Sequence, residues 1–167
     1  MKRLLFLTLT LLVSISLSAC STNGGVETVS NNQENSSSTA GLPVVSGAAG
    51  AEPIITPPTG TAPTTMQTED LIVGTGDLVL PTSTLTVHYV LMTWSDGKIV
   101  ESSWSGAPAT FPLSGVISGW QEGMPGMKAG GRRLLVLPPE KGYGAAGSGP
   151  IAPNETLIFV VDVISVS

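Results

Sequence analysis

Two segments of this chain carry apolar residues at every second position, and this pattern constrains its fold. In residues 85–91, and again in residues 157–163, every second residue is apolar. Successive side chains of a strand point to opposite faces, so each segment would place one apolar face against a core. We expect strands at residues 85–91, 132–138 and 156–166, and shorter ones at 71–73, 98–102 and 110–113.

One segment alone supports a helix. Ser118 can cap a short turn through residues 119–124, and Pro125-Gly126 ends it. Strands separated by turns, together with one short helix, predict an antiparallel sheet with a helix packed on one face. We therefore expect a single α+β domain over residues 66–167.

The N-terminus has the layout of a secretory signal. Lys2 and Arg3 precede an apolar run that ends in small residues before Cys20, the single cysteine of the chain. This run is shorter than the ~20 apolar residues of a membrane-spanning helix. The segment Leu-Ser-Ala-Cys at 17–20 resembles the bacterial lipoprotein box, in which the cysteine is lipidated. We expect residues 1–19 to be a signal peptide and lipid on Cys20 to anchor the protein to a membrane of the cell envelope, on its extracytoplasmic face. A plain signal peptide and an uncleaved anchor are the alternatives.

Residues 20–65 are rich in Ser, Thr, Gly and Pro and contain no aromatic residue. Proline interrupts their short apolar pieces, so the segment lacks the apolar area that would offset the entropy of ordering it. We expect a flexible tether here. A single short strand near Val44 is the alternative.

Charge and spacing exclude several kinds of site. The formal net charge is −5 and no basic stripe occurs, so nucleic acid is not an expected partner. The glycines at 142–147 have the spacing of a dinucleotide fingerprint, but the glycines and prolines that follow forbid the helix that such a site needs. His88 is the single histidine, has no clustered ligand partners and is expected to face solvent. We expect no metal and no cofactor.

Seven separated segments resemble, in order, the signatures of the FKBP-type peptidyl-prolyl cis–trans isomerases. The segment Val-Ile-Ser-Gly-Trp-Gln-Glu-Gly, for example, matches the family pattern VIxGWxEG. Together the segments span nearly all of residues 67–166. They are residues 87–89, 95–103, 109–113, 116–123, 127–133, 138–144 and 153–159.

The resemblance implies a half-wrapped antiparallel sheet with the short helix across its concave face and an apolar pocket between them. Trp120 would form the pocket floor, the Tyr143 hydroxyl would stand at the rim, and the Ile117 backbone N–H would meet the substrate carbonyl. Ordinary core packing is the alternative for each residue. The implied site residues are Tyr89, Val100, Glu101, Phe111, Val116, Ile117, Trp120, Tyr143 and Phe159.

The implied function is isomerisation of Xaa-Pro bonds in exported or cell-envelope polypeptides, by non-covalent stabilisation of the twisted amide. Macrolide ligands of this family and proline-containing polypeptides are the implied partners, and a monomer is the simplest state. Two departures stand in the implied pocket, because Val100 replaces the usual phenylalanine and Glu101 the usual aspartate. An attenuated enzyme, a proline-recognising binding or chaperone module with little catalysis, and a surface adhesion domain are therefore alternatives.

Overall fold

The protein is described by a computed structural model in which residues 41–167 can be placed. Cys20, the expected signal peptide and residues 20–40 of the expected tether lie outside this range, and what was expected of them stays a prediction. Within residues 41–167 no helix combines the length and apolarity needed to cross a membrane.

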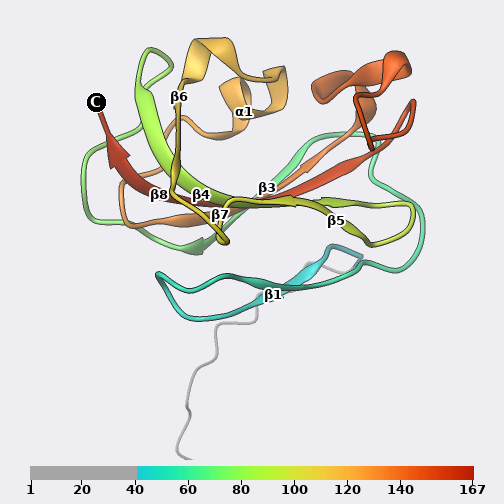
Figure 1. The fold of residues 1–167 in the computed structure, drawn as a ribbon, viewed down its shortest axis with the longest axis horizontal. Coiled ribbons are helices and arrows are strands. Elements are labelled where there is room, and N and C mark those ends of the chain that lie inside the picture. Colours follow the sequence, from blue (N-terminus) through green and yellow to red (C-terminus); the bar gives the residue numbers. More distant parts are fainter. Residues whose placement is uncertain (1–40) are drawn as a thin grey trace, which may run out of the picture. The chain divides into compact units, whose positions relative to one another are not determined.

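A six-stranded antiparallel sheet forms the body of the domain, as predicted (Figure 1). Its strand order is β3-β7-β8-β4-β5, and β6 pairs with the other half of β4. The central strands β4 and β8 pair from Leu85 and Val166 to Thr93 and Leu157. The strands are β3 (Gln67–Ile72), β4 (Thr84–Thr93), β5 (Ile99–Ser102), β6 (Ala109–Pro112), β7 (Arg132–Leu137) and β8 (Leu157–Val166).

The concave face of the sheet is covered by α1 (Ser118–Gly123), the α-helix that the sequence predicted. The residue at the N-cap is Ile117 rather than Ser118, and no side chain caps the helix. Two glycines let α1 approach β7. A Cβ at Gly119 would lie 2.5 Å from a methyl carbon of Leu137, and one at Gly123 would lie 2.8 Å from Leu135.

Three short 3₁₀ helices lie in the loops of the domain. The helix η1 (Leu113–Gly115) follows β6 directly, and η2 (Pro139–Lys141) and η3 (Gly144–Ala146) lie between β7 and β8. Tyr143 lies between η2 and η3. These helices bring loop residues to the same face of the sheet as α1 (Figure 1).

Residues 41–65, which we call the strap, differ from the flexible segment that the sequence analysis expected. The strap contains the antiparallel pair β1 (Val44–Ser46) and β2 (Ile54–Thr56), and it lies on the face of the sheet opposite α1 (Figure 1). Ile55 is buried there against a second apolar cluster. The buried members of that cluster are Ile55, Val90, Met92, Trp94, Leu134, Val136, Ile158 and Val160.

The central strands explain why the strap is ordered. In β7 and β8, neighbouring residues such as Leu134 and Leu135, or Phe159 and Val160, are all buried but belong to clusters on opposite faces. A sheet that is apolar on both faces must be covered on both. The strap supplies the second cover, although its own composition gives it little tendency to fold alone.

Arg132 on β7 pairs with Asp162 on β8 and also bonds to the strap. The Arg132 side chain is 1% exposed, and its Nε lies 2.9 Å from both carboxylate oxygens of Asp162. The remaining guanidinium nitrogens donate to the backbone carbonyls of Gly47 and Ala51 in the strap. Burial raises the pKa of Asp162, whereas the hydrogen bonds and charge of Arg132 act against that increase. Arg132 thus bonds to both the sheet and its cover.

His88 does not face solvent freely, contrary to the prediction. It is half-buried on the strap side of β4 and stacks on Trp104, with ring centroids 4.3 Å apart. Its Nδ1 lies 3.0 Å from the Ser103 hydroxyl.

Replacing Arg132 should destabilise the protein strongly. The change Arg132→Ala leaves the largely buried Asp162 carboxylate without its partner, and the loss of one partner of a buried pair typically costs about 3–5 kcal/mol. Urea unfolding should therefore show a much lower midpoint for this variant. Lys98→Ala, which removes a solvent-exposed pair with Asp96, is the control and should change the midpoint little. Equal midpoints for the two variants would contradict this account of Arg132.

Candidate active site

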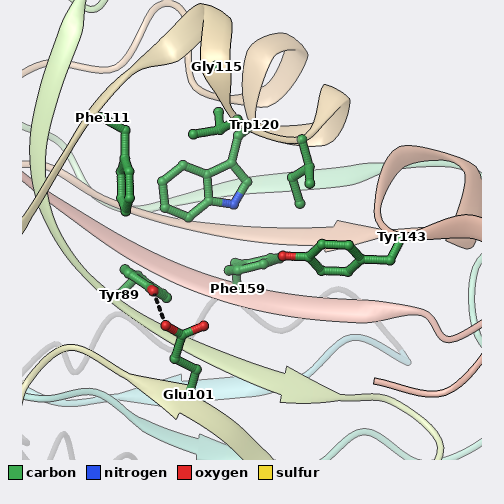
Figure 2. Close-up of a pocket in the computed structure, with 9 residues that line it drawn as sticks. Tyr89, Glu101, Phe111, Gly115, Trp120, Tyr143 and Phe159 are labelled. Atoms are coloured by element: carbon green, nitrogen blue, oxygen red, sulfur yellow. Dashed lines mark hydrogen bonds between the residues drawn. The ribbon is translucent and has the colours of Figure 1, made fainter. Parts of the chain in front are cut away.

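A cavity of about 360 Å³ lies between α1 and the concave face of the sheet (Figure 2). Eight of the nine residues that the sequence analysis selected line it. They come from four strands, α1 and the loops beside it, so the complete fold is needed to bring them together. The lining residues are Tyr89, Glu101, Phe111, Gly115, Val116, Ile117, Trp120, Tyr143 and Phe159.

Trp120 is the centre of an aromatic cluster in this cavity. Its indole meets Tyr89, Phe111 and Phe159 edge to face, with ring centroids 5.6, 6.1 and 5.4 Å away. Edge-to-face contacts of this kind add about 0.5–1.5 kcal/mol each to the apolar area that they bury. They fix the plane of the indole, which is 4% exposed and projects from α1 toward the sheet (Figure 2).

The strands place the aromatic side chains by register. Tyr89 lies on β4, and Phe159 on β8 pairs with Leu91, two residues further along the same face. Leu91 also pairs with Glu101 on β5, which sets that carboxylate beside Tyr89. Phe111 on β6 pairs with Leu85 at the other end of β4. Pairing with the single strand β4 therefore positions the lining residues of β5, β6 and β8.

A short hydrogen bond connects two of the lining residues. The Tyr89 hydroxyl donates to Glu101 Oε1 over 2.6 Å (Figure 2). Burial raises the pKa of Tyr89 well above its usual value, and the hydrogen bond and charge of Glu101 raise it further. Burial also raises the pKa of Tyr143, with a smaller contribution from the Glu101 charge. Both hydroxyls therefore remain protonated donors at neutral pH.

Val100 is the selected residue that does not line the cavity. A register shift between Leu91 and Met92 marks a bulge where β5 pairs with β4, and Val100 is the additional residue there. Its side chain is half-buried against the apolar cluster of the concave face. Gly115 lines the cavity but was not predicted, since it has no side chain and its backbone position follows from η1. The only feature of the sequence that could have indicated Gly115 is that it precedes Val116.

The chemistry of the lining is that of binding rather than of covalent attack. The single histidine lies on the opposite face of the sheet, stacked on Trp104. Within residues 41–167 no three metal-ligating side chains group together. The Ile117 N–H has no hydrogen-bond acceptor among the described residues, while the Ile117 carbonyl accepts the Trp120 and Gln121 N–H groups at the start of α1. The cavity can thus hold an apolar ring, and hydrogen-bond donors at its edge can reach polar groups attached to that ring.

Comparison with known proteins gives a consistent match over the sheet and α1. The family model for FKBP-type peptidyl-prolyl cis-trans isomerases matches residues 77–164. A probable FK506-binding protein of Corynebacterium glutamicum is 47% identical over 115 residues, which cover 68% of this chain and 98% of that protein. An FK506-binding protein of Streptomyces anulatus is 44% identical over 114 residues, covering 65% and 92%.

Solved structures show the same architecture. The crystal structure of FkpA from Escherichia coli superposes with a TM-score of 0.59 at 38% identity, covering 65% of this chain and 51% of that one. A peptidyl-prolyl cis-trans isomerase from Pseudomonas syringae superposes with a TM-score of 0.56 at 36% identity, covering 61% and 75%. These likenesses confirm the predicted sheet and helix.

A spectrophotometric pH titration tests the environment of the two hydroxyls. The chain has two tyrosines, Tyr89 and Tyr143, and the pKa of each is raised above the ordinary value of about 10. The folded protein should therefore form little tyrosinate at pH 10, whereas the urea-unfolded protein should be half ionised there. Because the folded state holds these protons more tightly, the free energy of unfolding should fall as pH rises above about 10. A folded-state titration of either tyrosine centred at pH 10 would contradict this geometry.

Proposed function

This chain belongs to the FKBP-type peptidyl-prolyl cis–trans isomerase family, and we propose that the cavity beneath α1 binds and isomerises Xaa-Pro bonds. Peptidyl-prolyl isomerisation is the activity of this family. The observation that carries the proposed site is the meeting of eight family-implied residues around one cavity. The residues that remain for catalysis are aromatic, aliphatic or hydroxyl-bearing, apart from the single carboxylate of Glu101.

Such a lining suits this reaction because rotation about an Xaa-Pro bond breaks no covalent bond. Amide resonance opposes the rotation with a barrier of ~18–20 kcal/mol. The planar amide is more polar than the twisted one, so a dry apolar cavity favours the twisted amide. A 10⁵-fold acceleration requires about 7 kcal/mol of stabilisation that is specific to the transition state.

Three groups of the cavity have separate roles in this proposal. The indole of Trp120 is the floor on which the proline ring lies, because it is rigidly held and almost fully buried. The Ile117 N–H, which has no acceptor among the described residues, donates to the carbonyl of the bound amide. The Tyr143 hydroxyl stands at the rim, 36% exposed as a residue, where a peptide backbone can reach it.

One observation favours the second candidate, a proline-binding or chaperone module with weak catalysis. Val100 packs beside the cavity, but its side chain is not part of the cavity lining. Where the family resemblance implies phenylalanine, valine gives up apolar area and an aromatic edge worth about 1 kcal/mol. A loss of this size lowers catalysis without abolishing it, so we expect the protein to be an active but attenuated enzyme rather than a pure binding module.

The substrates that we propose are proline-containing segments of exported or cell-envelope polypeptides. Two relatives are FK506-binding proteins by name. Because the cavity here is lined mainly by aromatic and aliphatic side chains, we propose that macrolides of this type occupy it in competition with substrate. The protein acts as a monomer in this proposal.

Lipid on Cys20 gives this activity its location in the proposal. Residues 2–20 have the order of charged, apolar and small residues that precedes a lipidated cysteine. Several acyl chains on one residue hold a protein firmly at a membrane, since each buried CH₂ contributes ~0.8 kcal/mol. The isomerase domain then works on the extracytoplasmic face of the envelope, joined to Cys20 by a short segment and the strap.

An isomerisation assay tests the proposed activity. The purified protein should accelerate cis-to-trans isomerisation of a Leu-Pro peptide, and FK506 should suppress that acceleration. Val100→Phe should raise kcat/KM about fivefold, since about 1 kcal/mol of aromatic contact is restored. Ile99→Phe is the matched control, because Ile99 is 54% exposed and does not line the cavity.

The outcomes separate the two candidates. Binding of FK506 without any acceleration by the wild-type protein would favour the binding module. An equal response of Val100→Phe and Ile99→Phe would show that position 100 does not limit catalysis. Neither acceleration nor binding would overturn the proposed function.

Fractionation of the natural host tests the location. The wild-type protein should sediment with membranes and incorporate labelled fatty acid, whereas Cys20→Ser should lose the label. Because the substitution leaves the strap and the domain intact, the variant should remain folded and active. A labelled Cys20→Ser protein would contradict the proposed anchor.

A further inference from the structure

We propose that Glu101 makes this isomerase prefer Xaa-Pro segments with a lysine or arginine next to the proline. The inference concerns the substrate class and rests on the proposed function of the cavity. It follows from the position of one carboxylate at the cavity mouth and from the charges around it.

Glu101 is the one charged residue among those that line the cavity. It is solvent-exposed on β5, and its Oε1 accepts the Tyr89 hydroxyl. Within residues 41–167 the Oε2 atom has no hydrogen-bond donor and no cation pairs with the carboxylate. Figure 2 shows the carboxylate hydrogen-bonded to Tyr89, at the edge of the space that the lining residues enclose. A ligand in that space meets an unneutralised negative charge.

The charge of Glu101 also affects the hydroxyl of Tyr143, which is another lining residue of the cavity. Its pKa is raised first by burial and then by the charge of Glu101, with no hydrogen bond between the two side chains. Glu101 and Tyr143 line the same cavity, so a ligand that lies between them is close to the Glu101 charge.

The cations of residues 41–167 do not neutralise Glu101. Of the seven Lys and Arg residues, two precede residue 41, and four of the remaining five form ion pairs with acidic side chains. The fifth, Lys128, lines a separate small depression beside Asp70 and Gly74. Residues 41–167 hold ten acidic residues against these five cations, because Glu27 and Glu34 are the two acidic residues outside that range. The domain is therefore net negative, and no free cation at the cavity cancels Glu101.

Charge at a binding site selects ligands by sign even where it adds little affinity. A cationic side chain within a few ångströms of Glu101 is attracted, and an acidic one is repelled. Since Glu101 is exposed to solvent, the effect is that of a surface charge pair and weakens with salt. We expect the ratio of kcat/KM for Lys-containing over Glu-containing peptides to be about 5 to 20 at low ionic strength. The ratio combines one attraction with one repulsion.

The experiment uses a peptide series on one scaffold, with Lys, Leu or Glu placed before or after the proline. Glu101→Gln keeps an oxygen that can accept the Tyr89 hydroxyl but removes the charge, so the Lys/Glu ratio should fall to about 1. Glu101→Lys should invert it. Asp77→Asn removes the same charge from an exposed position outside the cavity and should leave the ratio unchanged.

Ratios are the readout because Glu101 lines the cavity and its variants are expected to change the overall rate. A wild-type ratio near 1 at both positions, or a ratio that Glu101→Gln leaves unchanged, would overturn the inference while leaving the isomerase intact. If no peptide is isomerised, the proposed function fails, and peptide affinities measured by calorimetry then decide this inference. Tighter binding of the Lys peptides that depends on Glu101 would support it, and equal binding would overturn it.

Discussion

The central strands of this protein are apolar on both faces, and the rest of the structure depends on covering them. Leu135 and Phe159 point toward α1, while their neighbours Leu134 and Val160 point toward the strap. Each uncovered face would expose a continuous apolar surface, which soluble domains avoid. The helix and η1–η3 cover one face, and residues 41–65 cover the other. Arg132 fastens the second cover through Asp162 and two strap carbonyls.

The two covers have opposite consequences. The strap packs directly on the sheet. On the other face α1 meets β7 closely, because Gly119 and Gly123 have no side chains that would hold it away. Toward β4, β5 and β6 the space is left open, and aromatic side chains surround it without filling it. The cavity is therefore a consequence of how one short helix is seated on a curved sheet, and its rigidity comes from the edge-to-face contacts of Trp120.

Sequence patterns predicted the sheet, α1 and most of the cavity, and they failed where composition misleads. Apolar residues at every second position predicted β4 and β8, and the family resemblance supplied eight lining residues that no local pattern unites. The strap was expected to be flexible, with one short strand near Val44 only as the alternative, because its order comes from the sheet beneath it rather than from its own residues. The strands themselves indicated that a second cover was needed, since a run such as Leu134–Leu137 has no polar face that could point to solvent. Val100 was misplaced because a bulge in β5 cannot be read from spacing alone.

The most direct test of the account is an NMR titration of the ¹⁵N-labelled protein with a Leu-Pro peptide. If the cavity beneath α1 binds the proline, the backbone amide of Ile117 and the indole N–H of Trp120 should shift most, together with amides near Tyr143. The indoles of Trp94 and Trp104, which lie on the strap side of the sheet, should stay unchanged. Shifts centred on Trp94, Trp104 and the strap would contradict the account, because the binding site would then lie on the wrong face of the sheet.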